Sequence, residues 1–371
     1  MNDEINNIVL LWISPELNHY RIPGLELISA KIKKLIILSG ISLKEEGHIS
    51  ASNEGYLFKN VVTDATYRNF NRKYSVYKNI IQILKRHNPS YVLMPIEKKF
   101  ICIIFFLMIL KFFYGFKLLS YNHDLRAFRA NTVMNKMAIT IYKTLFHFYD
   151  KIIFYTKEGM DNSIIHNYIS KEKSYYAGNT IDTTRILDKY RLEKDFRNKN
   201  IVFIGRIVAK RRLELLIDFF TKLKISVCGC RLYIIGDGPL LDEYKKKFMS
   251  DEIIFLGGTT DEEKIAWIMN KSLININTGT TGLSILHCFS YGIPVIAFSN
   301  ISHPPEIDYV QNGYNGFMIE EYDTDKNITF VSGLLNDEKT YRELSENAIK
   351  TAKSLGIEIW SQNIINALRS R

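Results

Sequence analysis

The stretch from Thr278 to Phe298, "TGTTGLSILHCFSYGIPVIAF", combines two patterns that decide the fold. Its second half is an apolar strand, "IPVIAF", entered through Gly292 and Pro294. Its first half places two glycines, four hydroxyl side chains and a histidine at the start of a helical segment. The free N–H groups and the positive dipole end of a helix N-terminus attract anions, most often phosphates. The stretch therefore predicts a phosphate-binding loop just before a buried strand.

Short apolar segments alternate with helix-length segments along the whole chain. The first half has expected strands at 7–13, 34–40, 91–96, 117–123 and 151–156, with helical segments such as 68–86, 98–113 and 133–148 between them. The second half repeats the scheme with expected strands at 200–206, 231–238, 252–258, 272–278, 293–298 and 316–321. This order of strand and helix predicts an α/β protein with parallel sheets covered on both faces. The pattern occurs in two blocks, so we expect two Rossmann-like domains facing each other across a ligand-binding cleft. The expected limits are 1–180 for the first domain, 181–199 for a linker, 200–355 for the second domain, and 356–371 for a C-terminal helix that packs back toward the first domain.

Composition and charge narrow the class of protein. A chain of 371 residues with 46% hydrophobic and 24% charged residues is typical of a soluble globular protein of about two domains. The net charge of +10 belongs to the first half, where residues 51–150 carry 15 basic and 5 acidic side chains. Such a basic surface is either an ordinary solvated face or a contact for an anionic partner. Among anionic partners we favour a membrane surface over nucleic acid.

The sequence also bears on location and metals. The opening "MNDEINNIVLLWIS" lacks a basic leader and indicates a first strand, and the longest apolar stretch, "FICIIFFLMIL" at 100–110, is too short to span a bilayer. We expect a cytoplasmic protein, with peripheral attachment to the inner face of the membrane as an option. The four cysteines show no paired zinc spacing, so no metal site is expected.

Polar and glycine-rich turns follow the strands of the second half. "FIGRIVAKRR" (203–212) ends a strand at Gly205 and then supplies Arg206, Lys210 and Arg211. "IIGDGPLL" (234–241) and "FLGGTTDEEK" (255–264) open further helices, the second with a cap expected within Thr259 to Asp261. Any one turn is explained by surface charge and turn chemistry alone. Together, a basic cluster and an anion-binding helix start on successive strand ends predict a diphosphate site.

These motifs, followed by "HPPEIDYVQNGYNGFMI", resemble in order and spacing the C-terminal domain of retaining glycosyltransferases of family 4, which have the GT-B architecture. The resemblance covers about 200 to 320 and is limited in the first half to the strand order, the "YNHD" turn and "GNTID". It implies transfer of a sugar from a UDP- or GDP-linked donor to a glycan acceptor, lipid-linked, as in bacterial polysaccharide, lipopolysaccharide, O-antigen or capsule assembly. It implies retention of configuration, no cofactor and no bound metal.

The resemblance also assigns roles at the donor. Arg206, with Lys210 or Arg211, would clamp the diphosphate, and the choice between the last two stays open. The residues expected beside the base, ribose or diphosphate are Gly205, Gly236, Asp237, Gly238, Gly282 and Leu283.

The paired glutamates of the family fall here on Gly279 and His287. A ring nitrogen of His287 would hold the ribose, unless this is a packed helix histidine, whereas Gly279 has no side chain to contact the sugar. That contact would pass to Thr280, Thr281 or Ser284. Glu306 matches a frequent family glutamate and would either contact the donor or fix its loop.

The first half offers fewer site residues. By resemblance, His123 in "SYNHDLRAFRAN" would lie near the reacting sugar, although a lone histidine is often structural. The early "PELNHYRIP" stands where the family has a glycine-rich loop, and it offers His19, Tyr20 and Arg21 as acceptor or phosphate contacts. Arg126, in the segment 120–131, is a further expected acceptor contact.

Three other classes of function stay open at this stage. A nucleotide-sugar epimerase of the same architecture would turn over without an acceptor. A degenerate binding subunit would bind nucleotide without transferring sugar. A nucleic-acid-binding protein would show salt-sensitive retention of DNA but not of anionic lipid.

Overall fold

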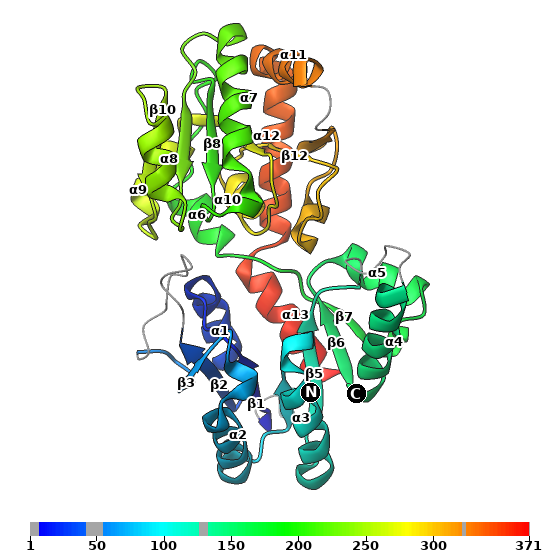
Figure 1. Ribbon diagram of the computed structural model, residues 1–371. Coiled ribbons are helices and arrows are strands. Elements are labelled where there is room, and N and C mark those ends of the chain that lie inside the picture. The colour runs from blue at the N-terminus through cyan, green and yellow to red at the C-terminus, as the bar shows by residue number, and fades with distance from the viewer. Residues whose placement is uncertain (1–6, 42–54, 126–132, 321–323, 371) are drawn as a thin grey trace. The chain divides into compact units, whose positions relative to one another are not determined.

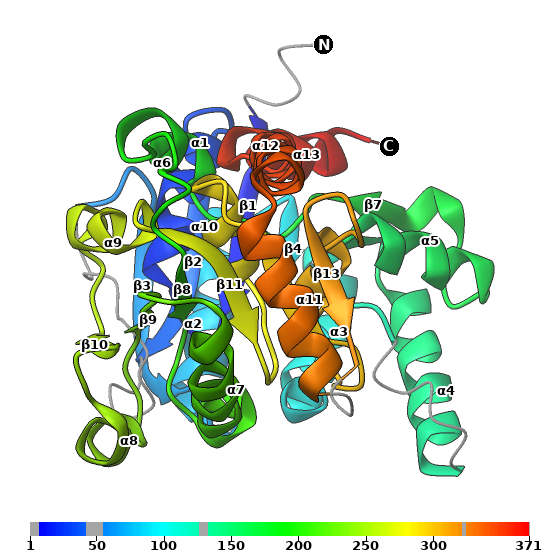
Figure 2. The ribbon, with the colours of Figure 1, turned by 90° about the horizontal axis from the view of Figure 1, so that it is seen from above.

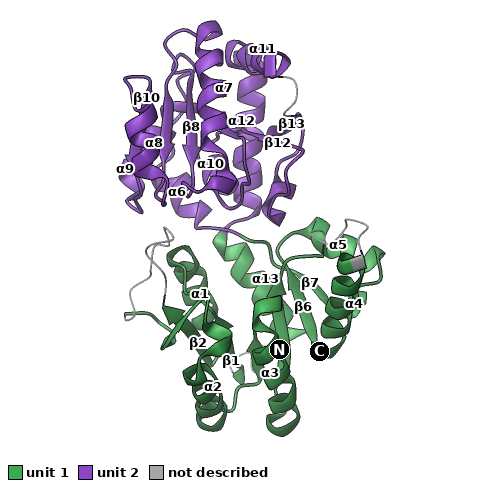
Figure 3. Cartoon of the chain, in the orientation of Figure 1, with its two compact units in different colours: residues 1–44, 48–179, 357–371 green, residues 45–47, 180–356 purple. Residues whose placement is uncertain are grey.

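The computed structural model describes residues 7–41, 55–125, 133–320 and 324–370. Their contacts form two compact α/β units (Figure 3). Among the described residues, unit 1 contains those up to 179 together with 357–370, and unit 2 contains 180–356. The chain therefore leaves unit 1, builds unit 2, and returns to unit 1 with its last helix.

Unit 1 is built on a sheet of seven parallel strands in the order β3-β2-β1-β4-β5-β6-β7 (Figure 1). The central strand β1 pairs with two neighbours, Leu10 lying opposite Leu35 of β2 and Tyr91 of β4. The strand order reverses there, and ligands of open α/β sheets bind at the carboxyl ends of strands at such a switch point. The strands are β1 (Val9–Ser14), β2 (Lys34–Ile41), β3 (Lys59–Thr66), β4 (Tyr91–Leu93), β5 (Lys117–Asn122), β6 (Lys151–Phe154) and β7 (Ser174–Tyr176).

Helices cover both faces of this sheet. Figure 2 shows α2, α3 and α4 on one side of it and α1 and α13 on the other, and the buried residues form two matching core clusters. Strands covered on both faces need near-continuous apolar sequence, which is why "VLLWI" and "KLIIL" do not alternate. The helices are α1 (Ile22–Ser29), α2 (Tyr74–His87), α3 (Ile101–Tyr114), α4 (Val133–Phe148), α5 (Lys157–Ile165) and α13 (Ile357–Arg369).

The C-terminal helix α13 is packed tightly against α1. Trp360 lies so close to Gly24 that a Cβ added at that glycine would be 2.5 Å from the indole ring. The Trp360 indole N–H donates to the Tyr121 hydroxyl at 3.0 Å, and this hydroxyl donates in turn to the carbonyl of Gly178. Residues more than two hundred positions apart are thereby joined beneath the strand ends of unit 1.

Unit 2 repeats the scheme with six parallel strands in the order β10-β9-β8-β11-β12-β13. Here β8 is the switch-point strand, because it pairs with both β9 and β11. The strands are β8 (Asn200–Ile204), β9 (Leu232–Ile235), β10 (Ile253–Gly257), β11 (Ser272–Asn277), β12 (Val295–Phe298) and β13 (Gly316–Ile319). The helices are α6 (Thr183–Lys189), α7 (Leu213–Ser226), α8 (Leu241–Phe248), α9 (Glu262–Met269), α10 (Ser284–Ser290), α11 (Thr324–Asn336) and α12 (Glu338–Ser354).

The predicted fold class of two Rossmann-like α/β units is confirmed, and two strands were not foreseen. Strand β3, "KNVVTDAT", is half polar because it lies at the edge of its sheet, and β7 has only three residues. The segment expected as a linker carries α6, which belongs to unit 2. The cap expected within Thr259 to Asp261 is Asp261, whose side chain accepts from the Glu263 N–H at 3.1 Å at the start of α9.

Candidate functional site

Three cations gather at the carboxyl end of β8, at the switch point of unit 2. Arg206 follows the strand through Gly205, and Lys210 and Arg211 lie in the 3-10 turn Ala209–Arg211. Burial, and then the charge of Arg206, lower the pKa of Arg211 to about 10, against the opposing effect of Glu306. Burial and the same two arginines also lower the pKa of Lys210. Cations that hold their protons less firmly than usual indicate a site short of negative charge.

The loop after β11 closes over this basic turn. The Thr280 N–H donates to the carbonyl of Lys210 at 3.0 Å, and the Arg211 guanidinium donates to the carbonyl of Thr280. The Thr278 hydroxyl donates to the carbonyl of Arg212 at 2.9 Å. Because β8 and β11 are neighbours, the two motifs that the sequence placed about seventy residues apart form one structure.

Gly279 is required at the point of closest approach. A Cβ there would lie 2.3 Å from the carbonyl carbon of Arg211 and 2.4 Å from the carbonyl oxygens of both Lys210 and Arg211. Real Cβ atoms do not come within 3.0 Å of such neighbours. A glutamate, which the family pattern places at this position, therefore cannot be accommodated unless the basic turn moves.

His303 fixes the other side of the loop, a role that the sequence did not indicate. Its Nε2 donates to the carbonyl of Phe298 at 2.7 Å, and its Nδ1 accepts from the Thr281 N–H at 3.3 Å. Only the neutral imidazole can do both, because a protonated ring has no acceptor. Burial lowers the pKa of His303, and the Arg211 charge adds to this effect although the bond to Phe298 opposes it. The one available signal was its place directly before "PPE".

The hydroxyl side chains of the loop are used unequally. Thr281 is fully buried and its hydroxyl pairs with that of Ser284 at 3.0 Å, whereas Thr280 is partly exposed. The amides of Thr280 and Thr281 are bonded within the protein, so an anion at this loop would use the amides of Gly282 and Leu283 onward. Helix α10 itself begins only at Ser284.

Glu306 places a carboxylate beside the cations. It lies in the 3-10 turn Pro305–Tyr309 and is 4% exposed. Its Oε2 is 3.7 Å from the position that a Cβ on Gly282 would take, and its charge stabilises protonated Arg211. Both predicted roles, donor contact and loop fixing, remain predictions.

His287 is bonded within the protein. Its Nε2 lies 2.8 Å from the carboxylate of Glu262 on α9, which also accepts from the Tyr291 hydroxyl at 2.7 Å. Burial alone would raise the pKa of Glu262, but the bonds from His287 and Tyr291 outweigh it and lower that pKa. A ribose contact by His287 stays a prediction, now restricted to Nδ1.

The glycine turns after β8 and β9 pack directly on each other. A Cβ at Gly236 would lie 1.8 Å from the carbonyl oxygen of Gly205, and one at Gly238 would lie 2.3 Å from that of Ile207. Asp237 is exposed, with its carboxylate accepting from the Gly238 N–H at 2.7 Å. These turns expose backbone beside the cations, and the exposed carboxylate of Asp237 is a side-chain group that they offer to a ribose or base.

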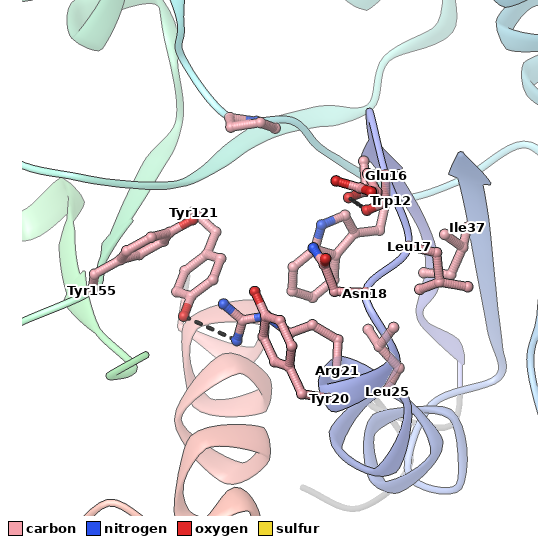
Figure 4. A pocket seen from close by; sticks show the side chains of 12 residues that line it. Trp12, Glu16, Leu17, Asn18, Tyr20, Arg21, Leu25, Ile37, Tyr121 and Tyr155 are labelled. Atoms are coloured by element: carbon pink, nitrogen blue, oxygen red, sulfur yellow. Dashed lines mark hydrogen bonds between the residues drawn. The ribbon is translucent and has the colours of Figure 1, made fainter. Parts of the chain in front are cut away.

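Unit 1 contains a separate pocket at its own switch point (Figure 4). Its walls come from β1, the turn after it and the start of α1, from β2 on one side of β1, and from the ends of β4, β5 and β6 on the other side. Aromatic rings alternate with polar groups around it, as in sites for small polar ligands with apolar faces. The lining residues used below are Trp12, Glu16, Tyr20, Arg21, Tyr121 and Tyr155.

Arg21 is the structural centre of this pocket. Figure 4 shows its guanidinium between Tyr20 and Tyr121, and it lies 5.2 Å from the ring centroids of both Tyr121 and Trp360. It donates to the side-chain oxygen of Asn179 and, at 3.4 Å, to the Tyr121 hydroxyl. The cation is thus held by rings and hydrogen bonds of the protein, and supports the pocket wall.

His123 stands next to the pocket, at the end of β5. Its ring centroid is 4.4 Å from that of Tyr155, its side chain is exposed, and its carbonyl accepts from the Asn122 side chain at 3.0 Å. His19 lies in the turn after β1 against Tyr20. Arg126 falls outside the described residues. No group of three or more possible metal ligands occurs in the described ranges, and the prediction that no metal is needed stays a prediction.

The fold and this site define the class of protein. Two Rossmann-like units with switch-point sites make the GT-B fold, and a structure of the Anabaena protein HepE in complex with UDP aligns over 98% of this chain and 100% of its own, with a TM-score of 0.69 and 15% identity. Sucrose-phosphate synthase of Thermosynechococcus elongatus aligns over 98% of both chains with a TM-score of 0.72 and 13% identity.

Sequence comparison then gives the family. Residues 185–351 match the family model of glycosyl transferases group 1, so unit 2 is a domain of that family. Poly(glycerol-phosphate) alpha-glucosyltransferase of Bacillus subtilis is 27% identical over 229 residues, 57% of this chain and 32% of its own. N-acetyl-alpha-D-glucosaminyl L-malate synthase of Bacillus anthracis is 24% identical over 52% of this chain and 49% of its own. The chain thus matches a third to a half of the length of these relatives.

Proposed function

We propose that this protein is a retaining glycosyltransferase of family 4, which moves a sugar from a UDP- or GDP-linked donor to a lipid-linked glycan acceptor in surface polysaccharide assembly. The observation that carries the proposal is the group of three cations at the end of β8, held in place by the loop 278–281 of a group 1 domain. The names of the relatives support it, and so does the HepE structure with bound UDP.

The cations would act on the leaving group. As the bond between the anomeric carbon and the diphosphate oxygen breaks, negative charge grows on the diphosphate, and Arg206, Lys210 and Arg211 stabilise it more strongly in the transition state than in the bound donor. The acceptor oxygen forms the new bond to the anomeric carbon, its proton is released, and the nucleoside diphosphate departs. No cofactor and no metal are part of this proposal.

The residues that select the sugar would differ from those of the family pattern. Position 279 carries no carboxylate and has no room for one. The groups that remain at the loop are the partly exposed Thr280 and Ser284 and the carboxylate of Glu306 beside Gly282. The carboxylate of Glu306, which comes from the turn Pro305–Tyr309 and not from position 279, would bind sugar hydroxyls as the family glutamate does, but from a different direction.

The pocket of unit 1 would bind the acceptor. Its aromatic faces suit the apolar face of a sugar ring, and Glu16 and Tyr20 can hydrogen-bond to hydroxyl groups. His123 beside Tyr155 would lie at the rim of this pocket. Arg21 supports the pocket from within, so its loss would disturb the shape of the acceptor site more than remove one contact.

A thermal-shift screen against UDP, GDP, ADP, CMP and their sugar conjugates tests the donor site. Saturation at about a hundred times the dissociation constant stabilises the native state by about 2.7 kcal/mol. Arg206→Ala and Arg211→Ala should each weaken binding by about tenfold or more, since a hydrogen bond to a charged group contributes about 1.5–3 kcal/mol. Arg231→Ala is the matched control, because this exposed arginine lies just before β9, at the amino ends of the strands and thus at the end of the sheet away from the cations. No shift with any nucleotide, or equal losses in all three variants, would contradict the donor site.

A transfer assay separates the remaining alternatives. Sugar transfer to a glycan acceptor, with the anomeric configuration of the product determined by NMR, supports the transferase and its retention. Turnover of the donor without acceptor would indicate an epimerase. Nucleotide binding without turnover would indicate a degenerate subunit, an outcome that the absence of carboxylates at positions 279 and 287 makes worth testing.

A lipid-linked acceptor also requires access to a membrane. We place the protein in the cytoplasm, attached peripherally to the inner face of the cytoplasmic membrane, with anionic lipid and not nucleic acid as the partner of the basic first half. Vesicle binding without DNA binding at the same ionic strength would support this choice, and the reverse result would overturn it.

A further inference from the structure

Helix α3 is apolar on its outward face as well as on its inward face. Its inward residues Ile103, Ile104 and Leu107 are fully buried in the core of unit 1. Its exposed residues recur at intervals of three or four, so they form a single stripe along the helix. That stripe consists of Cys102, Phe105, Ile109, Phe112 and Phe113. Phe112 is 89% exposed and Phe113 is 75% exposed, which is unusual for two adjacent phenylalanines in water.

Helix α4 carries a second stripe of the same kind. Met134, Met137, Ile141 and Phe148 are all exposed, at intervals that keep them on one side of the helix. The opposite side of α4, with Tyr142, Leu145 and Phe146, is buried in the same core cluster as α3.

The two stripes lie on one surface of unit 1. Both helices cover the same face of the sheet (Figure 2). Their C-terminal ends are joined through Lys111 of α3, whose amine donates to the carbonyl of Phe148 at 3.3 Å and pairs with Asp150 at 2.7 Å. We call this surface the α3–α4 face and define it by Phe105, Ile109, Phe112, Phe113, Met134, Met137, Ile141 and Phe148. Apolar surfaces of this extent mark sites of protein or membrane contact.

The charges around the α3–α4 face select the partner. Neither helix contains an acidic residue, whereas Lys136 and Lys143 are exposed on α4 and Lys98 and Lys99 precede α3. A second copy of the chain on this face would bring lysines together, which costs energy. An anionic lipid surface attracts the lysines near it and accepts the apolar side chains into its interior. Phenylalanine, methionine and lysine together are the composition of a surface that lies on a membrane.

We propose that the α3–α4 face docks this protein on an anionic bilayer, with Phe112 and Phe113 entering the boundary between headgroups and acyl chains and the lysines remaining at the phosphates. Within the described ranges, no helix has the length and apolar character to cross a membrane. Docking would bring the protein to the membrane that holds the lipid-linked acceptor of the proposed function. Docking itself depends on neither nucleotide binding nor sugar transfer. The two proposals can therefore fail separately.

Vesicle flotation with the full chain tests the docking. We expect binding to vesicles of phosphatidylcholine with about a third phosphatidylglycerol, and weaker binding to phosphatidylcholine alone, because the lysines act through the surface potential. Phe112→Ser with Phe113→Ser should lower the partition coefficient at least about tenfold, given the apolar area withdrawn from the bilayer. Ile225→Ser with Met249→Ser, two exposed apolar residues of unit 2, should leave it unchanged. All four side chains are exposed, so we expect both double variants to fold, and their melting temperatures check this.

The native cysteines provide a second measurement. Cys102 lies on the stripe of α3 and Cys228 is exposed in unit 2, whereas Cys230 and Cys288 are buried. An environment-sensitive fluorophore on Cys102, in a Cys228→Ser background, should shift to the blue when anionic vesicles are added. The same fluorophore on Cys228, in a Cys102→Ser background, should not.

Several results would overturn the proposal. One is no binding of the native chain to anionic vesicles, and another is equal binding by the Phe112→Ser, Phe113→Ser variant. A third is a dimer of the native chain that this variant converts to a monomer, which would assign the α3–α4 face to a second copy. Failure of nucleotide binding or transfer, with vesicle docking intact, would count against the proposed function alone.

Discussion

Replacing Gly279 tests the account of the donor loop most directly. The structure requires that any Cβ there move away from the carbonyl of Arg211 by at least 0.7 Å, the difference between the 3.0 Å limit and the 2.3 Å found. The neighbours are backbone atoms of the basic turn and cannot rotate aside. Forcing extra atoms into a packed site costs about 1–3 kcal/mol, and an overlap with three backbone atoms of one turn belongs at the upper end.

The expected effects of Gly279→Ala and Gly279→Glu follow from this estimate. About 3 kcal/mol corresponds to a fall of about 6–12 °C in the melting temperature of a unit of this size. Displacement of Lys210 and Arg211 should also weaken nucleotide binding by about tenfold or more, since each charge-assisted hydrogen bond contributes about 1.5–3 kcal/mol. Restoring the glutamate of the family pattern should therefore reduce activity in this protein.

Scanning calorimetry and titration calorimetry with the nucleotide measure both effects. Gly282→Ala is the matched control in the same loop, because a Cβ there would meet nothing closer than 3.7 Å. Its melting temperature should stay near that of the native chain, so it controls for stability and not for affinity, because the Gly282 amide belongs to the anion-binding loop itself. A melting temperature of Gly279→Ala equal to that of Gly282→Ala would contradict this prediction, and so would nucleotide binding by Gly279→Glu as tight as that of the native chain.

Three further predictions follow from the packing and the pKa values. Gly24→Ala should destabilise unit 1 by about 1–3 kcal/mol in urea unfolding, because its Cβ would overlap Trp360, and Trp360→Leu in the same chain should recover part of the loss. Donor binding should weaken as the pH falls through the lowered pKa of folded His303, which lies below the ordinary histidine value of about 6.5, because the protonated ring cannot accept from the Thr281 N–H. The stabilisation that this bond gives to the fold is present above the unfolded pKa and is lost as the pH falls from there through the folded pKa. A UDP- or GDP-sugar is the ligand to titrate, since its diphosphate does not change charge in this range, and His303→Ala should abolish the pH dependence. Burial lowers the pKa of Lys194 to about 7, whereas in the unfolded chain this lysine keeps its proton up to the ordinary lysine range. The free energy of unfolding should therefore rise from about pH 7 to about pH 9 by up to about 2 kcal/mol in the native chain but not in Lys194→Met. An equal rise in the two proteins would contradict this assignment.

Local chemistry allowed much of the fold to be predicted. The apolar runs at 34–40, 117–123 and 272–278 could only be strands covered on both faces, and the alternation with helices required parallel order. The helix segment at 133–148 was predicted with the limits that the structure shows. Strand β3 was missed because an edge strand needs no continuous apolar run, and β7 because three residues carry no periodicity.

The features of the site that depend on neighbouring residues could be predicted, and the contacts between residues far apart in the sequence could not. The basic turn and the glycine loop were recognisable from their own residues, since anion binding uses local backbone geometry and charge. The bond of His303 to Thr281 and the pairing of His287 with Glu262 were not, because in each pair the two residues follow different strands. The sequence by itself determined the strands, the two α/β blocks, and the cations and glycines that suit a diphosphate.

Only the tertiary structure decided why Gly279 is glycine, because the atoms that exclude a side chain belong to the turn 209–211 and reach position 279 through the pairing of β8 with β11. It likewise decided that the C-terminal helix supports the pocket of unit 1 and that α3 and α4 turn apolar faces outward. Sequence periodicity specifies which residues share a face of a helix. Which of two apolar faces is buried depends on the sheet against which the helix packs, and that is a property of the folded chain.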